Sequence, residues 1–309
     1  MPGQLEGAAE MKVYLSFPRG FCAGVDRAVE VVMIALERLG APVYVKHQIV
    51  HNPLVVSTLE GMGAVTVENV DEIPEGSTVV FSAHGSPPED FESAKARGLN
   101  VIDATCPLVT KVHNEAHRYA DEGRKLIFVG HRGHQEVKGS MGQRPMHLID
   151  DREGVNLPDW GADTRVTVLT QTTLSVDDTH DTIEQIKDRF PDTMVRNDLC
   201  YATTNRQAAV KELCKWVELV FVIGAPNSSN CNRLREVAIG RGIAAYLVNG
   251  PEELDPRLIE GVENLGITSG ASTPESLVES IIEALGPDEV IPIRGVDEDV
   301  SFVLPREMR

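Results

Sequence analysis

Three cysteines, Cys22, Cys106 and Cys200, have matching surroundings in the sequence. Each follows a short apolar stretch and directly precedes a segment with helical periodicity. At the start of a helix, unpaired N–H groups and the helix dipole favour the thiolate, which is the form that binds metals. Three thiolates leave one coordination position open, which is typical of a catalytic centre rather than a structural one. In a [4Fe–4S] cluster, one iron would stay free to bind a substrate oxygen.

Polar loops recur at nearly constant distances after these cysteines. A loop with His51 comes 29 residues after the first cysteine, one with His134 comes 28 after the second, and one with Asn230 comes 30 after the third. A second set of polar loops comes one apolar stretch later in each pass, at Ser82–Ser86, Thr170–Thr173 and Thr268–Ser272. Short strand–loop–helix segments resemble one another in any α/β protein, but this agreement in spacing favours an internal repeat.

The elements around these loops alternate between short apolar strands and amphipathic helices, a pattern that predicts parallel sheets. In such sheets, ligands bind at the carboxyl ends of the strands. We therefore expect an α/β fold in which three units form a trefoil around a pseudo-threefold axis and enclose a central cluster cavity. The predicted units are 11–104, 105–198 and 199–285, and residues 286–309 are expected to form a tail that returns to the first unit.

The composition limits the classes of function. The chain has 309 residues, of which 42% are hydrophobic, so a sizeable core is expected. The 29 basic and 47 acidic residues give a net charge of −18, which argues against a nucleic-acid or anionic-membrane surface. No apolar run approaches the length of a bilayer span. The first ten residues lack the pattern of a signal peptide. These features predict a cytoplasmic protein.

The other two cysteines are expected to have lesser roles. No pair forms Cys-x-x-Cys, and an odd number of cysteines in so long a chain does not indicate a disulfide framework. Cys214 lies at helical spacing from Val210 and is predicted to be a core residue. Cys231, in a polar loop, is predicted to be a bystander near the site.

Several motifs occur in a fixed order along the chain, and together they resemble one family. They include Phe17–Val25, Ile49–Asn52, Ser82–Gly85, Asp103–Pro107, Gly133–His134 with Glu136, Thr170–Thr173, Asn197–Thr203, Ser228–Asn230 and Gly270–Ser272. In this order they resemble the IspH/LytB family, the 4-hydroxy-3-methylbut-2-enyl diphosphate reductases of the non-mevalonate isoprenoid pathway. The likeness extends from about Val13 to Leu285 and weakly to Phe302–Leu304.

The resemblance implies a trefoil of α/β units around a [4Fe–4S] cluster held by the three cysteines named above. It implies reductive removal of an allylic hydroxyl, which yields isopentenyl and dimethylallyl diphosphate, with a ferredoxin or flavodoxin as electron donor. By motif, Glu136 is the proton donor, and Thr172 orients the substrate hydroxyl and the proton relay. The residues that bind the diphosphate are then His51, His84, His134, Ser228, Ser229, Asn230 and Ser272. To carry a proton at neutral pH, Glu136 needs a pKa raised by burial.

Two residues depart from the family pattern. Gln135 stands where a proline is common, which could loosen the loop that carries Glu136. Cys231 stands where a serine is common, and it adds a thiol close to an oxygen-sensitive site.

Three other functions remain open at the level of sequence. A second three-cysteine [4Fe–4S] enzyme, a dehydratase similar to quinolinate synthase, would need no external electron donor. An iron–sulfur sensor would explain the cysteines but would leave Glu136 and the polar loops without a role. A zinc hydrolase would be colourless, which metal analysis and a spectrum would detect.

Overall fold

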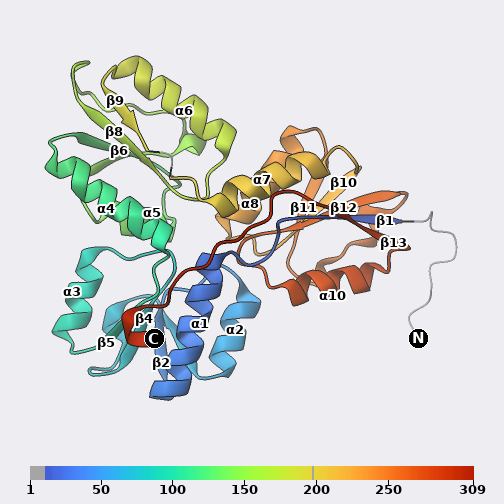
Figure 1. Cartoon of the computed structure of the whole chain (residues 1–309), viewed down its shortest axis with the longest axis horizontal. Helices are drawn as coiled ribbons and strands as arrows, with labels where there is room; N and C mark the ends of the chain where they lie inside the picture. Colours follow the sequence, from blue (N-terminus) through green and yellow to red (C-terminus); the bar gives the residue numbers. More distant parts are fainter. Residues whose placement is uncertain (1–10, 197) are drawn as a thin grey trace. The chain divides into compact units, whose positions relative to one another are not determined.

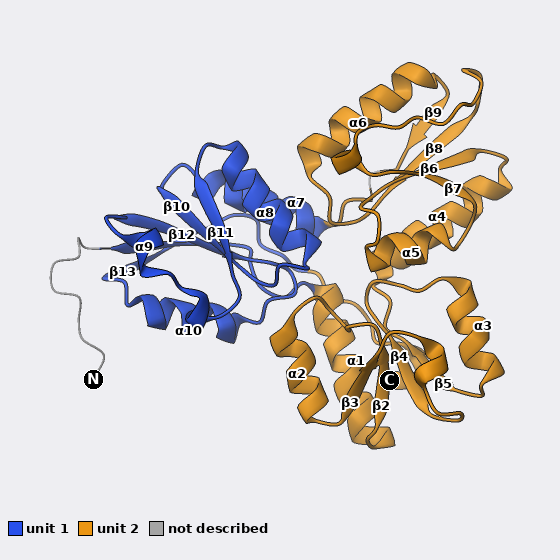
Figure 2. Ribbon diagram, turned by 180° about the vertical axis from the view of Figure 1, so that it is seen from behind, with its two compact units in different colours: residues 1–22, 201–299 blue, residues 23–200, 300–309 orange. Residues whose placement is uncertain are grey.

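The computed structural model describes residues 11–196 and 198–309 (Figure 1). The first ten residues and Asn197, which belongs to the motif before Cys200, lie outside this range. The chain divides into two compact units, one of residues 1–22 and 201–299 and the other of residues 23–200 and 300–309 (Figure 2).

The unit of residues 23–200 and 300–309 contains two four-stranded parallel sheets. The first has the strand order β3-β2-β4-β5. Its strands are β2 (Val43–Lys46), β3 (Ala64–Val67), β4 (Thr78–Phe81) and β5 (Asn100–Asp103). The helices of this part are α1 (Ala23–Leu39), α2 (Pro53–Gly61) and α3 (Pro88–Ala96), with the 3-10 turn η1 (Val70–Glu72). Val79, Phe81 and Ile73 are fully buried in the core of this part.

The second sheet of this unit has the order β7-β6-β8-β9. Its strands are β6 (Lys125–Val129), β7 (Met146–Ile149), β8 (Val166–Thr170) and β9 (Thr193–Val195). The helices are α4 (Pro107–Asp121), α5 (Gln135–Met141) and α6 (Val176–Arg189), with the turn η2 (Asp151–Glu153). The turn η4 (Arg306–Met308) also belongs to this unit and contacts α1. All five residues of β8 are buried, as expected for the centre of a parallel sheet covered on both faces.

The unit of residues 1–22 and 201–299 contains one five-stranded parallel sheet with the order β11-β10-β12-β1-β13. Its strands are β1 (Lys12–Ser16), β10 (Leu219–Ile223), β11 (Ala244–Val248), β12 (Asn264–Ser269) and β13 (Glu289–Ile293). Its helices are α7 (Tyr201–Leu213), α8 (Ser229–Gly240), α9 (Pro256–Ile259) and α10 (Glu275–Leu285), with the turn η3 (Pro251–Glu253). The fully buried Phe221, Ile223 and Ile267 lie in its core.

The three sheets share one strand order, which is the structural form of the repeat in the sequence. In each sheet, the fourth strand of the order is the one that directly precedes a cysteine: β5 precedes Cys106, β9 precedes Cys200, and β1 precedes Cys22. The strand β13 adds to the outer edge of β1. The predicted α/β fold with parallel sheets in three repeats is therefore confirmed for the described residues.

The position of β1 differs from the predicted boundaries, which assign residues 11–104 to the first unit. β1 pairs with β12 and β13, so it completes the sheet formed by the last third of the chain. The reason is that the strand directly before each cysteine joins the three strands of the preceding repeat. For Cys22, those strands are β10, β11 and β12, which come from the other end of the chain. The predicted tail likewise divides, since β13 joins this sheet while residues 300–309 belong to the unit that holds α1.

The helices follow from their apolar periodicity. In α1, Val25, Val32 and Leu36 recur at helical spacing and are buried. Among the described residues, none of the helices combines the length and the apolar character that crossing a bilayer would need.

Candidate active site

The backbone places the three predicted ligand cysteines at equivalent positions. In each case, the N–H of the cysteine donates to a backbone carbonyl oxygen. The accepting residue lies two positions after the end of the third strand in the order of its sheet, which is β4, β8 or β12. The three bonds are Cys106 to Ala83 at 3.0 Å, Cys200 to Thr172 at 3.1 Å and Cys22 to Ala271 at 3.2 Å. Each polar loop of the second predicted set therefore anchors one cysteine.

Each of these cysteines is half-buried, and a helix starts at the next residue: α1 at Ala23, α4 at Pro107 and α7 at Tyr201. A helix start favours the thiolate over the thiol. Cysteine thiolates are the usual ligands of iron–sulfur clusters, so this donor set fits such a group.

Three histidines from different loops lie together in the unit of residues 23–200. The ring centroids of His51 and His84 are 4.1 Å apart, those of His51 and His134 are 5.4 Å apart, and those of His84 and His134 are 5.9 Å apart. Each histidine follows the carboxyl end of a strand, β2, β4 or β6. The structure thus brings together the three histidines that the sequence analysis selected.

These histidines are neutral at pH 7. Burial lowers the pKa of His51 to about 4 and that of His134 to about 3, and neighbouring histidines add to the effect. Burial also lowers the pKa of His84 well below its usual value. An anion bound beside them would favour the protonated form and raise these pKa values.

The low pKa values of these half-buried histidines predict that the iron-free chain loses stability in acid. Between pH 6.5 and about 4, the unfolded chain binds more protons at His51 than the folded chain does, so the free energy of unfolding should fall as the pH falls through this range. Urea unfolding at pH 7, 6 and 5 measures this slope. His51→Asn should flatten it, whereas His180→Asn, at an exposed position of α6, should not. Equal slopes in all three proteins would contradict the prediction.

Glu136 is a buried carboxyl group held by Thr172. The Thr172 N–H donates to Oε1 at 2.6 Å, and the Thr172 hydroxyl donates to Oε2 at 2.9 Å. Burial raises the pKa of Glu136 to about 7, an effect that these two hydrogen bonds oppose and the charge of Asp198 reinforces. The side chain therefore carries a proton for much of the time at neutral pH, as the predicted role requires.

The helix that carries Glu136 begins at Gln135, with His134 as its N-cap. The ring Nδ1 of His134 accepts a hydrogen bond from the Glu136 N–H at 3.2 Å. The backbone of His134 is extended, with φ −65° and ψ 141°. Gln135 therefore occupies the first helical position without disturbing the cap.

That position is the one where proline is favoured, and an extended preceding residue is compatible with it. Gln135→Pro should therefore stabilise the chain by about 0.4–1 kcal/mol, because proline restricts the unfolded chain more than the folded one. Denaturant unfolding measures the change, with Gln135→Ala as the control. A loss of stability in Gln135→Pro would show that the backbone N–H of Gln135 has a required partner.

The unit of residues 201–299 positions a second group of predicted binding residues. Ser228 is the N-cap of α8, and its hydroxyl accepts from the Cys231 N–H at 3.3 Å. The Asn230 side-chain oxygen accepts from the Ala271 N–H at 3.0 Å, while its buried Nδ2 donor has no hydrogen-bond partner within the described residues. Ser272 is buried, and Ser229 is the first residue of α8. A buried amide donor without a partner is typical of a site that binds an acceptor.

Cys231 is a packing residue in this structure. Its side chain is fully buried, and its sulfur lies so close to Gly224 and Gly270 that a Cβ at either position would overlap with it. Burial raises the pKa of Cys231, which disfavours the reactive thiolate. Cys214 is half-buried against the core that contains Val210, in agreement with its predicted role.

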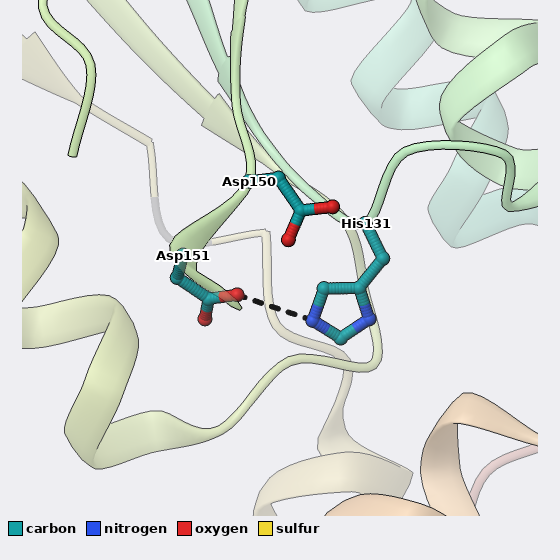
Figure 3. A group of neighbouring side chains, drawn as sticks. All are labelled: His131, Asp150 and Asp151. Atoms are coloured by element: carbon teal, nitrogen blue, oxygen red, sulfur yellow. Dashed lines mark ion pairs between the residues drawn. The ribbon is translucent and has the colours of Figure 1, made fainter. Parts of the chain in front are cut away.

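Sequence reasoning missed a group of side chains beside the loop that carries His134. Figure 3 shows His131 with Asp150 and Asp151, and His131 Nε2 lies 3.2 Å from Asp151 Oδ1. Asp150 accepts from Arg152 Nε at 2.9 Å and from the Arg132 N–H at 2.7 Å. Burial alone would raise the pKa of Asp150, but these hydrogen bonds hold it below its usual range.

Because Arg152 already neutralises Asp150, we interpret this group as a support for the loop rather than as a metal site. The N–H of His131 also donates to the side-chain oxygen of Gln171 at 3.0 Å, which links this loop to the loop of Thr172. The position of His131 next to the Gly133–His134 motif was the signal in the sequence that could have identified it.

The chain is similar to known proteins along most of its length. The family model described as LytB protein matches residues 13–286. A 4-hydroxy-3-methylbut-2-enyl diphosphate reductase of Zymomonas mobilis is 51% identical over 306 residues, which cover 97% of this chain and 90% of that protein. One of Actinobacillus pleuropneumoniae serotype 5b is 49% identical, with 97% and 98% covered.

Solved structures are similar along most of the chain. The E-1-hydroxy-2-methyl-but-2-enyl-4-diphosphate reductase of Plasmodium falciparum has a TM-score of 0.92 at 36% identity, with 97% of both chains covered. A second structure, titled as (E)-4-hydroxy-3-methyl-but-2-enyl diphosphate reductase, the terminal enzyme of the non-mevalonate pathway, has a TM-score of 0.65 at 32% identity. It covers 89% of this chain and 99% of that chain.

Proposed function

Because the chain belongs to the LytB family, an iron–sulfur reductase family of the non-mevalonate pathway, we propose that it reduces (E)-4-hydroxy-3-methylbut-2-enyl diphosphate. The products are isopentenyl and dimethylallyl diphosphate. The reaction replaces a C–O bond by a C–H bond, and it consumes two electrons and two protons and releases water. The alternatives of a quinolinate-synthase-like dehydratase, a sensor or a zinc hydrolase lack support from these relatives.

Cys22, Cys106 and Cys200 are the ligands of a [4Fe–4S] cluster in this proposal. Their support is the equivalent backbone bond that each makes and the helix start that follows each one. When bound, such a cluster supplies electrons and an open iron that can polarise an alcohol oxygen. The protein's own residues then have to bind the diphosphate, orient the hydroxyl group and deliver the proton.

The hydrogen bonds of Thr172 are the observation on which the proposal mainly depends. Its carbonyl oxygen accepts from the N–H of Cys200, while its own N–H and hydroxyl donate to Glu136. One residue therefore connects a proposed cluster ligand with the proposed acid. Glu136, with a pKa of about 7, donates a proton to the departing hydroxyl group, and the Thr172 hydroxyl orients this group and relays the proton.

The diphosphate is bound by His51, His84 and His134 and by Ser228, Ser229, Asn230 and Ser272. The clustered, neutral histidines offer ring N–H donors, and they gain charge when an anion raises their pKa. Asn230 offers its unpartnered Nδ2, and serine hydroxyls donate further hydrogen bonds. Local donors are needed because the net charge of −18 repels an anionic substrate.

The electron donor in this proposal is a small ferredoxin or flavodoxin, as the family resemblance implies. The test is anaerobic purification, with iron and sulfide counted and products measured with and without a reductant. About four irons per chain and product formation that depends on the reductant are the expected results. A product formed without any reductant would favour the dehydratase, and a colourless zinc protein would favour the hydrolase.

A further inference from the structure

One cation stands near the start of each helix that follows a proposed cluster ligand. Arg27 is the fifth residue of α1, Lys111 is the fifth of α4, and Arg206 is the sixth of α7. We call these three residues the helix cations. Their common place in the repeat indicates a common contact.

Arg27 is buried, and it binds the backbone just before Cys106. Its guanidinium donates to the carbonyl oxygens of Ala104 at 3.1 Å and Thr105 at 3.0 Å. Its Nε donates to the carbonyl oxygen of Val303 at 2.9 Å. Within the described part of the chain, no carboxylate forms an ion pair with Arg27. The nearby charges of Asp103 and Cys106 favour the buried guanidinium, which offsets part of the cost of its burial.

Arg206 makes the corresponding contact before Cys22. It is fully buried, and it donates to the carbonyl oxygen of Gly20 at 2.8 Å. Its charge is neutralised by Glu298, whose Oε1 lies 3.0 Å away. Gly20 has φ +71°, a conformation that favours glycine, so the backbone that leads into Cys22 is held in a tight turn.

Lys111 makes the third contact, before Cys200. Its Nζ lies 3.1 Å from Oδ1 of Asp198, whose side chain is buried, and 3.8 Å from Glu115. The other oxygen of Asp198 accepts from the Thr170 N–H at 3.3 Å. Lys111 itself is 43% exposed, unlike the two arginines.

The three contacts follow one rule. Ala104, Asp198 and Gly20 each lie two residues before a proposed ligand cysteine. Arg27, which follows Cys22, contacts the residue two positions before Cys106. Lys111, which follows Cys106, contacts the one two positions before Cys200, and Arg206, which follows Cys200, contacts the one two positions before Cys22. A buried arginine is often only structural. The contacted residue lies two positions before its cysteine in all three cases, and the cations follow their own cysteines by five, five and six positions. This agreement favours a role tied to the cysteines.

We propose that the helix cations are positioning residues for the iron–sulfur centre. Arg27 and Arg206 bind backbone carbonyl oxygens ahead of the next ligand cysteine, and Lys111 pairs with the carboxylate of Asp198. These contacts hold the loops in place before the metal binds. This inference rests on the proposed ligand role of the cysteines. Groups that support metal ligands in this way typically contribute about 10–100-fold to metal affinity.

Lys111→Met is the decisive variant, because a half-exposed lysine can be replaced without opening the core. After anaerobic reconstitution, we expect it to lose iron to a chelator about tenfold faster than the wild-type chain. Lys111→Arg, which can still reach Asp198, should restore slow loss. Arg118→Met, at an exposed cation of the same helix, should behave like the wild type. Arg27→Met should show a larger effect, up to about 100-fold.

The thermal midpoint of the iron-free chains separates positioning from simple folding. Faster iron loss in Lys111→Met with an unchanged midpoint supports the proposal. The proposal is overturned if Lys111→Met loses iron no faster than Arg118→Met. It is also overturned if the thermal midpoint of iron-free Lys111→Met falls far enough to account for the faster iron loss. If Arg27→Met does not fold, the comparison between Lys111→Met and Lys111→Arg decides alone. A wild-type chain that binds no iron would instead contradict the proposed function.

Discussion

Replacement of Glu136 by Gln should lower turnover by about 10²–10⁴-fold, the usual contribution of a general acid. The amide keeps the shape of the carboxyl group, and its oxygen can still accept from the Thr172 N–H, which donates to Glu136 at 2.6 Å. It cannot deliver a proton to the leaving hydroxyl group. The iron content and the substrate-induced change in the spectrum should therefore stay close to those of the wild type. Single-turnover measurements under anaerobic conditions give the rate.

The pH dependence provides a second test of the same residue. Only the protonated carboxyl can donate, and burial raises the pKa of Glu136 to about 7. The wild-type rate should therefore be level below about pH 7 and fall as the pH rises above it. Glu136→Gln should lose this dependence. Glu89→Gln serves as the control, because Glu89 has the same place in the first turn of α3 but is exposed. A variant Glu136→Gln with wild-type turnover would remove this residue from the mechanism.

Cys106→Ser should abolish the bound cluster and with it the activity. A serine hydroxyl ionises far less readily than a thiol, so one of the three proposed ligands is lost. We expect the iron content to fall from about four per chain to well below one, with loss of colour. The backbone bond from residue 106 to Ala83 does not depend on the side chain, so the fold should survive. Circular dichroism of the iron-free chains checks this point.

The matched control for Cys106→Ser is Cys214→Ser. Cys214 is also a half-buried thiol, but it lies just after the end of α7 and packs at the edge of the core around Val210 and Leu213. Its replacement should leave the iron content unchanged. Full iron content in Cys106→Ser would show that Cys106 is not a ligand, whereas iron loss in both variants would point to a general effect on folding.

Local patterns predicted much of the fold because they report which residues face the core. The stripe of Val25, Val32 and Leu36 predicts a helix, and the structure places all three in the interior of α1. The continuous apolar run Leu219–Ile223 is a fully buried strand. The repeat was also visible, because each pass of the chain has the same order of strand, cysteine and polar loop.

The sheet that β1 joins could not be predicted in this way. A strand of five residues carries no information about its partner, since any parallel edge satisfies its backbone hydrogen bonds equally well. Pairing with β12 and β13 connects residues 12–16 with residues 264–269 and 289–293, and only the packed chain decides such distant contacts.

For the site, the sequence by itself determined the chemical groups: three thiols in matching surroundings, a carboxyl group at Glu136, and loops with histidine, serine and asparagine. The tertiary structure alone decided their environment. It buries Glu136 beneath Thr172, which raises its pKa to about 7, and it gathers His51, His84 and His134, whose pKa values burial lowers. The physical reason is that solvation and electrostatic energies depend on every atom packed around a group, and most of those atoms come from distant parts of the chain.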